Sequence, residues 1–145
     1  MRDIKLEIMF YIYNQSMAKV IKKHYTTVDR LCKSNEFFKQ DLEIICKRQF
    51  TGLKDKTGVE IYEGDIVEIY SEQRGSSFNG CPEEDRDVTW RGEVHYRPSS
   101  GFGLKRVLFM DESMNKFESH GPLKNIVQYK AKVIGNIYEN LGLLK

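Results

Sequence analysis

The side chains most often used for metal binding and nucleophilic chemistry are few in this sequence, and they lie far apart. They are His24, His95 and His120, and Cys32, Cys46 and Cys81. No two histidines have the HxH or HxxxH spacing of a zinc site, and no two cysteines form a CxxC pair. An odd number of widely spaced cysteines also disfavours a disulfide framework. We therefore expect reduced thiols, no metal and no cofactor.

Two groups of carboxylates could act as a general acid pair or hold a divalent cation. Glu63 and Asp65 flank Gly64, in a turn where Asp65 can accept hydrogen bonds from backbone N–H groups. A second acidic group lies between residues 83 and 87, in a polar stretch where carboxylates favour solubility. The sequence has no GxSxG, Walker or GxGxxG motif. We expect no enzyme and no small-molecule substrate, and keep a metal-dependent hydrolase using Glu63 and Asp65 as an alternative.

Basic and aromatic residues are concentrated towards the amino terminus. Residues 1–56 contain 12 Lys and Arg against 7 Asp and Glu, whereas residues 57–145 contain 11 against 14. Tyrosines interleaved with lysines could stack on bases and contact phosphates. The candidate nucleic-acid contacts are Lys19, Lys22, Lys23, Tyr25, Lys47 and Arg48. Ordinary solvated lysines and packed tyrosines explain the same pattern.

Length and composition predict one soluble globular domain. The chain has 145 residues, of which 40% are hydrophobic and 30% charged. No apolar run approaches the roughly 20 residues of a membrane-spanning helix, so no membrane contact is expected. The first seven residues mix charged with apolar side chains, unlike the apolar core of a signal peptide. We expect a cytoplasmic protein.

The first 50 residues read as a hairpin with a short added helix. Apolar residues alternate with others from Ile4 to Ile12, which is the period of a strand with one apolar face. Residues 17–25 would return as the second arm, with lysines keeping one side wet. A capped helical turn is expected at residues 34–42, and a strand at residues 42–50.

Glycines mark the corners of the rest of the chain. Gly52 and Gly58 bracket a polar reversing loop, and Gly64 with Asp65 forms a second turn between strands at residues 59–62 and 66–70. Residues 71–87 read as a long exposed loop.

Further strands are expected at residues 88–97, 102–110 and 130–138. In residues 88–97 the side chains at 88, 90, 92, 94 and 96 would face the core, and the alternate ones, Glu93 included, would face solvent. Gly135 is a candidate bulge or close-approach site. The whole pattern predicts a mainly β fold: a small, strongly bent antiparallel sheet or barrel, with an amino-terminal β-hairpin and one short helix.

Two segments resemble the YopX-like family of phage and prophage proteins. Residues 50–67, FTGLKDKTGVEIYEGDIV, are similar to the family signature, and residues 133–140, VIGNIYEN, are similar to its closing motif. The opening MRDIK is also similar to family starts. The sequence departs from the family after that opening and at Leu141 and Gly142, where a Pro-Glu pair is usual.

The resemblance implies an SH3-like β-roll over residues 50–145, preceded by an added element at residues 1–49, all within one YopX-like domain of phage or prophage origin in a bacterial host cell. It implies no catalytic residues. The motif residues Gly52, Gly58, Gly64, Asp65 and Gly135 are those that turns require. We therefore expect a non-enzymatic module that binds a protein partner or its own copies, with nucleic-acid binding as the alternative.

Overall fold

The computed structural model describes residues 4–13, 16, 18–33, 43–73, 86–110, 116–119, 126 and 130–145. The expected helix at residues 34–42 lies outside the described residues. The chain divides into two compact units, Met1–Thr51 and Gly52–Lys145. Strand β3 (Glu43–Lys54) begins in the first unit and ends in the second.

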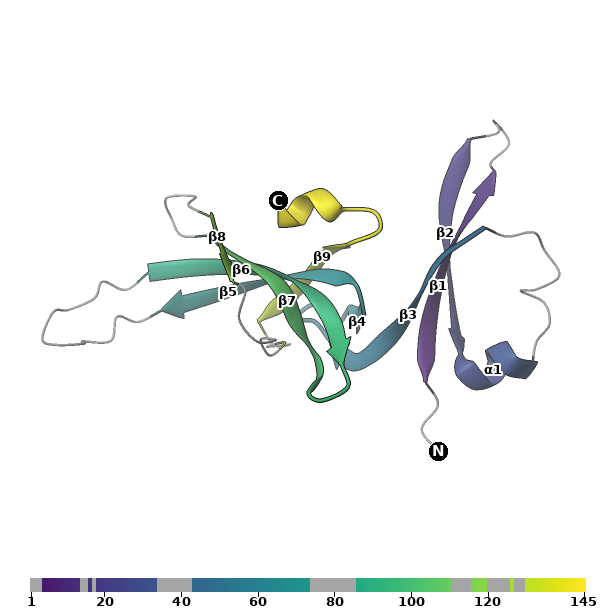
Figure 1. Ribbon diagram of the computed structural model, residues 1–145, viewed down its shortest axis with the longest axis horizontal. Coiled ribbons are helices and arrows are strands. Elements are labelled where there is room, and N and C mark those ends of the chain that lie inside the picture. Colours follow the sequence, from purple (N-terminus) through teal and green to yellow (C-terminus); the bar gives the residue numbers. More distant parts are fainter. Residues whose placement is uncertain are drawn as a thin grey trace, which may run out of the picture. The chain divides into compact units, whose positions relative to one another are not determined.

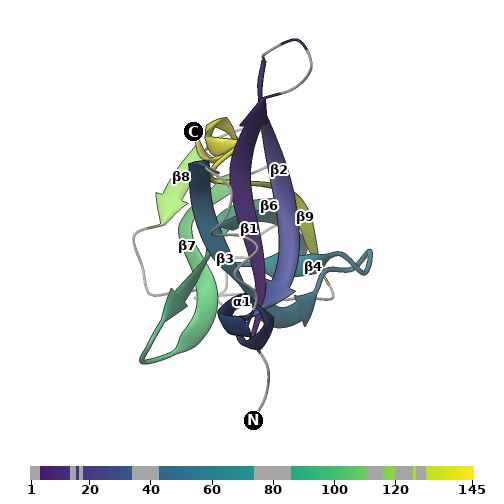
Figure 2. The ribbon, with the colours of Figure 1, turned by 90° about the vertical axis from the view of Figure 1, so that its right-hand side faces the viewer.

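The first unit is an antiparallel sheet with one short helix. Strand β1 (Lys5–Tyr13) lies between β2 (Lys19–Thr27) and β3, and α1 (Val28–Lys33) follows β2 directly (Figure 2). The β1–β2 hairpin pairs without interruption from Lys5 with Thr27 to Tyr13 with Lys19. The β1–β3 pairing shifts register between Met9 and Phe10, which marks a bulge.

The centre of β1 is buried on both of its faces. Ile8 and Met9, which point to opposite sides of the sheet, are 1% and 0% exposed. Glu7 is also buried. Burial therefore differs from the expected single apolar face in a second way as well. Ile4, at the start of the apolar series, is 45% exposed.

The second unit is built on a curled five-stranded antiparallel sheet of order β8-β7-β6-β5-β9 (Figure 1). The strands are β5 (Asp65–Gln73), β6 (Arg86–Arg97), β7 (Gly101–Met110), β8 (Lys116–Ser119) and β9 (Ala131–Asn136). The short β4 (Glu60–Tyr62) follows β3 in the hydrogen-bonded order of the other sheet. A 3-10 helix, η2 (Leu141–Leu144), lies against β6 and β7.

One face of the curled sheet carries the hydrophobic core. Its buried residues are Ile61, Val67, Ile69, Val94, Leu104, Val107 and Ala131. Trp90 and Val133 are partly buried and pack against them. These residues come from β4, β5, β6, β7 and β9, so the core ties together the strands that contain both resembling segments.

The mainly β fold class, with a strongly bent antiparallel sheet, an amino-terminal hairpin and one short helix, is confirmed. Three details differ. Residues 71–73 and 86–87 extend β5 and β6, so the expected loop at residues 71–87 is shorter. β8 lies at Lys116–Ser119, between the strands expected at residues 102–110 and 130–138, where no strand was expected. The described helix α1, which begins at Val28 directly after β2, lies where no helix was expected.

Candidate functional site

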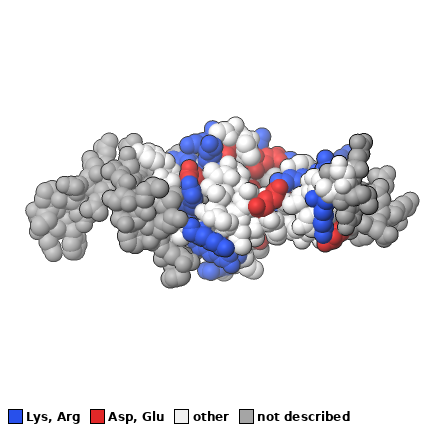
Figure 3. Space-filling model, turned by 90° about the horizontal axis from the view of Figure 1, so that it is seen from above, with Lys and Arg blue, Asp and Glu red and all other residues white. Residues whose placement is uncertain are grey.

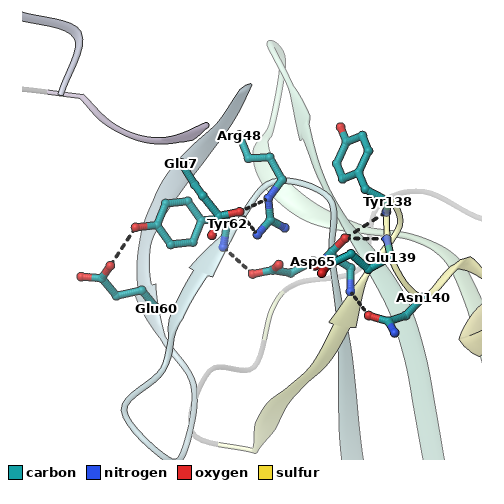
Figure 4. A network of polar contacts seen from close by, with 9 residues as sticks. Glu7, Arg48, Glu60, Tyr62, Asp65, Tyr138, Glu139 and Asn140 are labelled. Carbon is teal, nitrogen blue, oxygen red and sulfur yellow. Dashed lines mark hydrogen bonds and ion pairs between the residues drawn. The ribbon is translucent and has the colours of Figure 1, made fainter. Parts of the chain in front are cut away.

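The turn at Gly64 is fixed by contacts from three strands and the carboxyl-terminal segment. Asp65 is buried, and its Oδ2 accepts a hydrogen bond of 2.7 Å from the backbone N–H of Tyr62 (Figure 4). Gly64 has φ +81°, and its N–H donates to the carbonyl of Val94 at 2.7 Å. A Cβ added at Gly64 would lie 3.1 Å from a ring carbon of Tyr138. Asp65 therefore closes the turn, and Gly64 leaves room for the tyrosine.

Asp55 holds the preceding loop to β9. Its Oδ1 accepts hydrogen bonds from the N–H and hydroxyl of Thr57, both at 2.8 Å, and from the N–H of Val59 at 3.0 Å. Its Oδ2 accepts the N–H of Val133 at 2.9 Å. Burial raises the pKa of Asp55, but the hydrogen bonds from Val133, Thr57 and Val59 outweigh it, and the pKa lies below its usual value.

Sequence reasoning did not single out Asp55, although the signal was present. An aspartate with a threonine two residues later and a glycine three residues later is typical of a turn in which the carboxylate accepts backbone N–H groups. Gly58 in this loop has φ +89°. Gly52 has φ +86° but lies inside β3, and not in the reversing loop where the sequence pattern put it.

Gly135 lies beside a bulge in β9 and in close contact with the Asn140 side chain. The β5–β9 register shifts where Ile66 faces Gly135 and Val67 faces Val133, which makes Ile134 an extra residue in β9. A Cβ at Gly135 would lie 2.7 Å from Oδ1 of Asn140.

The chain after β9 is held by side-chain amides (Figure 4). The Oδ1 atom of Asn136 accepts the N–H groups of Tyr138 and Glu139, each at 3.0 Å. The Nδ2 atom of Asn136 donates to the Glu139 carboxylate. These contacts shape the exit from β9, and the residues of the closing motif make them.

The polar face of β6 is less exposed than the alternation predicts. Glu93 is buried at 3% exposure, so its expected place in solvent is wrong. Its Oε1 lies 3.0 Å from Lys105 Nζ, and its Oε2 lies 3.8 Å from Arg106 Nε. Arg106 has φ +51°, in the stretch where the β6–β7 register shifts. This bulge brings two cations of β7 beside the buried carboxylate.

Glu63 and Asp65 make contacts with different partners. Asp65 accepts a backbone N–H of its own turn, whereas Glu63 Oε1 lies 3.8 Å from His95 Nδ1 and 3.4 Å from the backbone nitrogen of Tyr96. Within the described ranges no group of three or more His, Cys, Asp or Glu could hold a metal ion. The acidic residues 83–85 lie outside the described residues.

The structure divides the predicted nucleic-acid contacts. Successive residues of a strand point to opposite faces, so Lys22 lies on one face of the sheet, and Lys23 and Tyr25 lie on the other. Ile8 of β1 is opposite His24 of β2 on one side and opposite Lys47 of β3 on the other. Lys47 therefore lies on the same face of the sheet as His24 and Lys22. Lys19 lies on the Lys23 face, with its Nζ 2.7 Å from Glu43 and 3.9 Å from the centre of the Tyr11 ring.

Arg48 is not a surface residue, so its predicted contact with nucleic acid is wrong. Its side chain is 4% exposed, and its Nε donates to Glu7 Oε1 at 2.9 Å (Figure 4). Glu7 is 3% exposed. Sequence reasoning missed this buried ion pair, although Arg48 shares its parity in β3 with the apolar residues Ile44 and Cys46.

Among the described strands, β2 is the long strand at a sheet edge. The edge strand β4 has three residues and β8 has four. The edge strand β9 is met by the loop after β3, since Val133 N–H donates to Asp55 and Lys56 N–H donates to the carbonyl of Ala131 at 3.0 Å. β2 has nine residues, and those from Lys22 to Tyr25 are all exposed. This edge is the candidate site.

The helices described in the structure are all too short or too polar to cross a membrane. No curated protein matches the chain in sequence. The family model described as YopX protein matches residues 3–145. That match includes both resembling segments, whose residues form the Gly64 turn, the Asp55 loop and the exit from β9. The chain therefore belongs to the YopX protein family.

Proposed function

We propose that this protein is a non-enzymatic binding module, and that it binds a protein partner by adding one of the partner's strands to the edge of β2. The observation that carries the proposal is the position of β2 at the end of the order β2-β1-β3-β4. An edge strand presents backbone N–H and C=O groups on its outer side, and an extended segment can pair with them.

The other sheet edges in the described part of the chain are less suited to binding an added strand than β2 is. A three- or four-residue strand such as β4 or β8 offers few ladder hydrogen bonds to a partner. On β9 the Asp55 carboxylate already accepts the N–H of Val133, in the way that loops commonly cover edges. Nine residues of β2 span a length typical of a full strand.

Nucleic-acid binding is the less favoured alternative. The candidate contacts lie on two opposite faces of the first sheet, and Arg48 is buried against Glu7. On the face drawn in Figure 3, acidic side chains lie directly beside basic ones. A phosphate backbone is bound best by a continuous basic groove.

Selection of displayed nine-residue peptides on the whole protein tests the proposal. Enriched peptides should slow backbone amide exchange within residues 19–27, because the outer N–H groups of β2 become hydrogen bonded. A peptide that scrambles the order of an enriched sequence is the control. Enriched peptides that protect only other residues, or a selection that enriches none, would show the proposal to be wrong.

A further inference from the structure

We infer that residues 137–145 form a strap that opens from the outer face of the curled sheet while the sheet stays folded, and that this opening exposes Ile66 and Glu93. The outer face is the face opposite the one that carries the hydrophobic core. The inference concerns the second unit alone and does not rest on strand binding at β2. It rests on the cross-strand register, on the contact between Asn140 and Gly135, and on a buried oxygen of Glu93.

One row of residues crosses the outer face. Gly135 of β9 is opposite Ile66 of β5. Ile66 is opposite Glu93 of β6, which in turn is opposite Lys105 of β7. Residues directly opposite each other in a sheet point to the same side. Ile66 is 0% exposed but is not among the residues of the hydrophobic core, which agrees with a side chain on the outer face.

The strap lies across this row. A Cβ added at Gly135 would lie 2.7 Å from Oδ1 of Asn140 and 3.0 Å from its Cβ. The Asn140 side chain therefore rests on the outer face, over Gly135. The next residues form η2, which lies against β6 and β7 (Figure 1). On this path from β9 to β6 and β7 the strap passes over Ile66 and Glu93, and both are buried.

The closed strap buries little of itself and leaves a polar atom unsatisfied. None of the residues of η2 is buried. The Oε2 atom of Glu93 is buried, and no described residue donates a hydrogen bond to it. Arg106 Nε lies 3.8 Å away, which is beyond hydrogen-bond distance. Opening would give this oxygen water, and segments with few buried contacts open before the rest of a fold.

Hydrogen exchange on the whole protein tests the opening. The N–H groups of Asn140 and Leu143 donate to the carbonyls of Asn136 and Asn140. They should exchange about 100-fold faster than the ladder N–H groups of β6 and β7, because their exchange requires only the strap to open. Equal exchange rates would show that the strap leaves only when the sheet unfolds, and the inference would be wrong.

Labelling of carboxylates tests what the strap covers. Gly135→Ala places a methyl group against the Asn140 side chain and should hold the strap open. A carbodiimide with glycine ethyl ester should then modify Glu93 about fivefold faster than in the wild type, as measured by mass spectrometry of peptides. Gly142→Ala is the matched control, because its added Cβ meets nothing within 4 Å. Neither glycine has a positive φ, so both alanines fit the backbone.

A second variant separates the opening of the strap from a defect in the sheet. Asn140→Ala removes the side chain that rests on Gly135 without crowding β9, and it should also expose Glu93. Circular dichroism checks that each variant folds. If Glu93 stays protected in Asn140→Ala while the strap N–H groups exchange quickly, the strap does not cover this carboxylate. Labelling of Glu93 that rises as much in Gly142→Ala as in Gly135→Ala would also overturn the inference.

Discussion

At the scale of residues, two aspartates close the loops that follow β3 and β4, and they act over different distances along the chain. Asp65 accepts the N–H of Tyr62, three residues away. Asp55 accepts the N–H groups of Thr57 and Val59 in its own loop, and also that of Val133, 78 residues away. One carboxylate therefore shapes a turn and covers a sheet edge.

Replacing Asp55 by asparagine should destabilise the protein by about 1–3 kcal/mol at pH 7. An asparagine amide would present its NH₂ group to N–H donors that now share the two oxygens of Asp55. Urea unfolding followed by circular dichroism measures the loss.

The same substitution has a pH signature. The pKa of Asp55 is lowered on folding, so its carboxylate stabilises the fold fully above its unfolded pKa of about 3.9. That contribution is lost as the pH falls through the lower, folded pKa. The difference in melting temperature between wild type and Asp55→Asn should therefore narrow below about pH 4. A constant difference from pH 7 to pH 3 would contradict the role of the charge.

Gly64→Ala should destabilise the protein more than Gly58→Ala. Both glycines have positive φ, where an alanine costs about 1–2 kcal/mol. At Gly58 a Cβ meets nothing within 4 Å, but at Gly64 it meets Tyr138 at 3.1 Å. The two melting temperatures separate the steric cost from the backbone cost. Equal losses of melting temperature in the two alanine variants would show that Tyr138 moves aside at no cost. Gly64→Val should lower the melting temperature more than either alanine substitution.

At the scale of elements, a buried ion pair between Glu7 and Arg48 joins β1 to β3. Glu7 and Arg48 are directly opposite in the register of these two strands. Replacing Arg48 by methionine would leave the Glu7 carboxylate buried without its cation, which costs about 3–5 kcal/mol. Denaturant unfolding should show this loss.

A second substitution checks the cause. Glu7→Leu together with Arg48→Met removes both charges, and an apolar pair of similar volume is often neutral in a buried site. The double variant should recover most of the stability lost by Arg48→Met alone. A double variant as unstable as the single one would place the role of Arg48 in contacts other than this ion pair.

Strand alternation predicted the elements well and burial less well. It located β1, β5, β6, β7 and β9, because period two survives in each. It failed at Glu7 and Glu93, since alternation assumes that one face of each strand is wet. Both carboxylates are buried beside a cation from a neighbouring strand, Arg48 for Glu7 and Lys105 for Glu93. Pairing of this kind depends on register across strands, which local sequence does not encode.

The candidate site shows the same division between local and distant information. The lysines of β2 and its expected role as an edge follow from the sequence of the hairpin alone. The separation of Lys22 from Lys23 and Tyr25 follows from period two, once β2 is known to be a strand. The hydrogen bond from Val133 to Asp55, which covers the edge of β9, does not follow from local sequence. The two residues are distant in sequence, and only the folded sheet brings them together.

At the scale of the whole molecule, charge on β2 should keep the protein from associating with itself. Replacing Lys22 and Lys23 by threonine removes two gatekeeping charges and adds residues that favour strands. The variant should form concentration-dependent oligomers by light scattering, whereas Lys54→Thr with Lys56→Thr should behave as wild type. A threonine variant that stays at the wild-type mass at every concentration would remove the protective role of these lysines.

The hydrogen bond between Asp55 and Val133 also sets an order of events during synthesis. Asp55 emerges from the ribosome 78 residues before Val133, whose N–H its carboxylate accepts in the folded protein. Contacts between such distant residues form late, because a long loop must close first. Until Val133 appears, β5 lacks its neighbour β9 on a nascent chain that already displays its apolar side chains. Slow translation across residues 74–130 would therefore lengthen the time for which β5 has no β9 beside it.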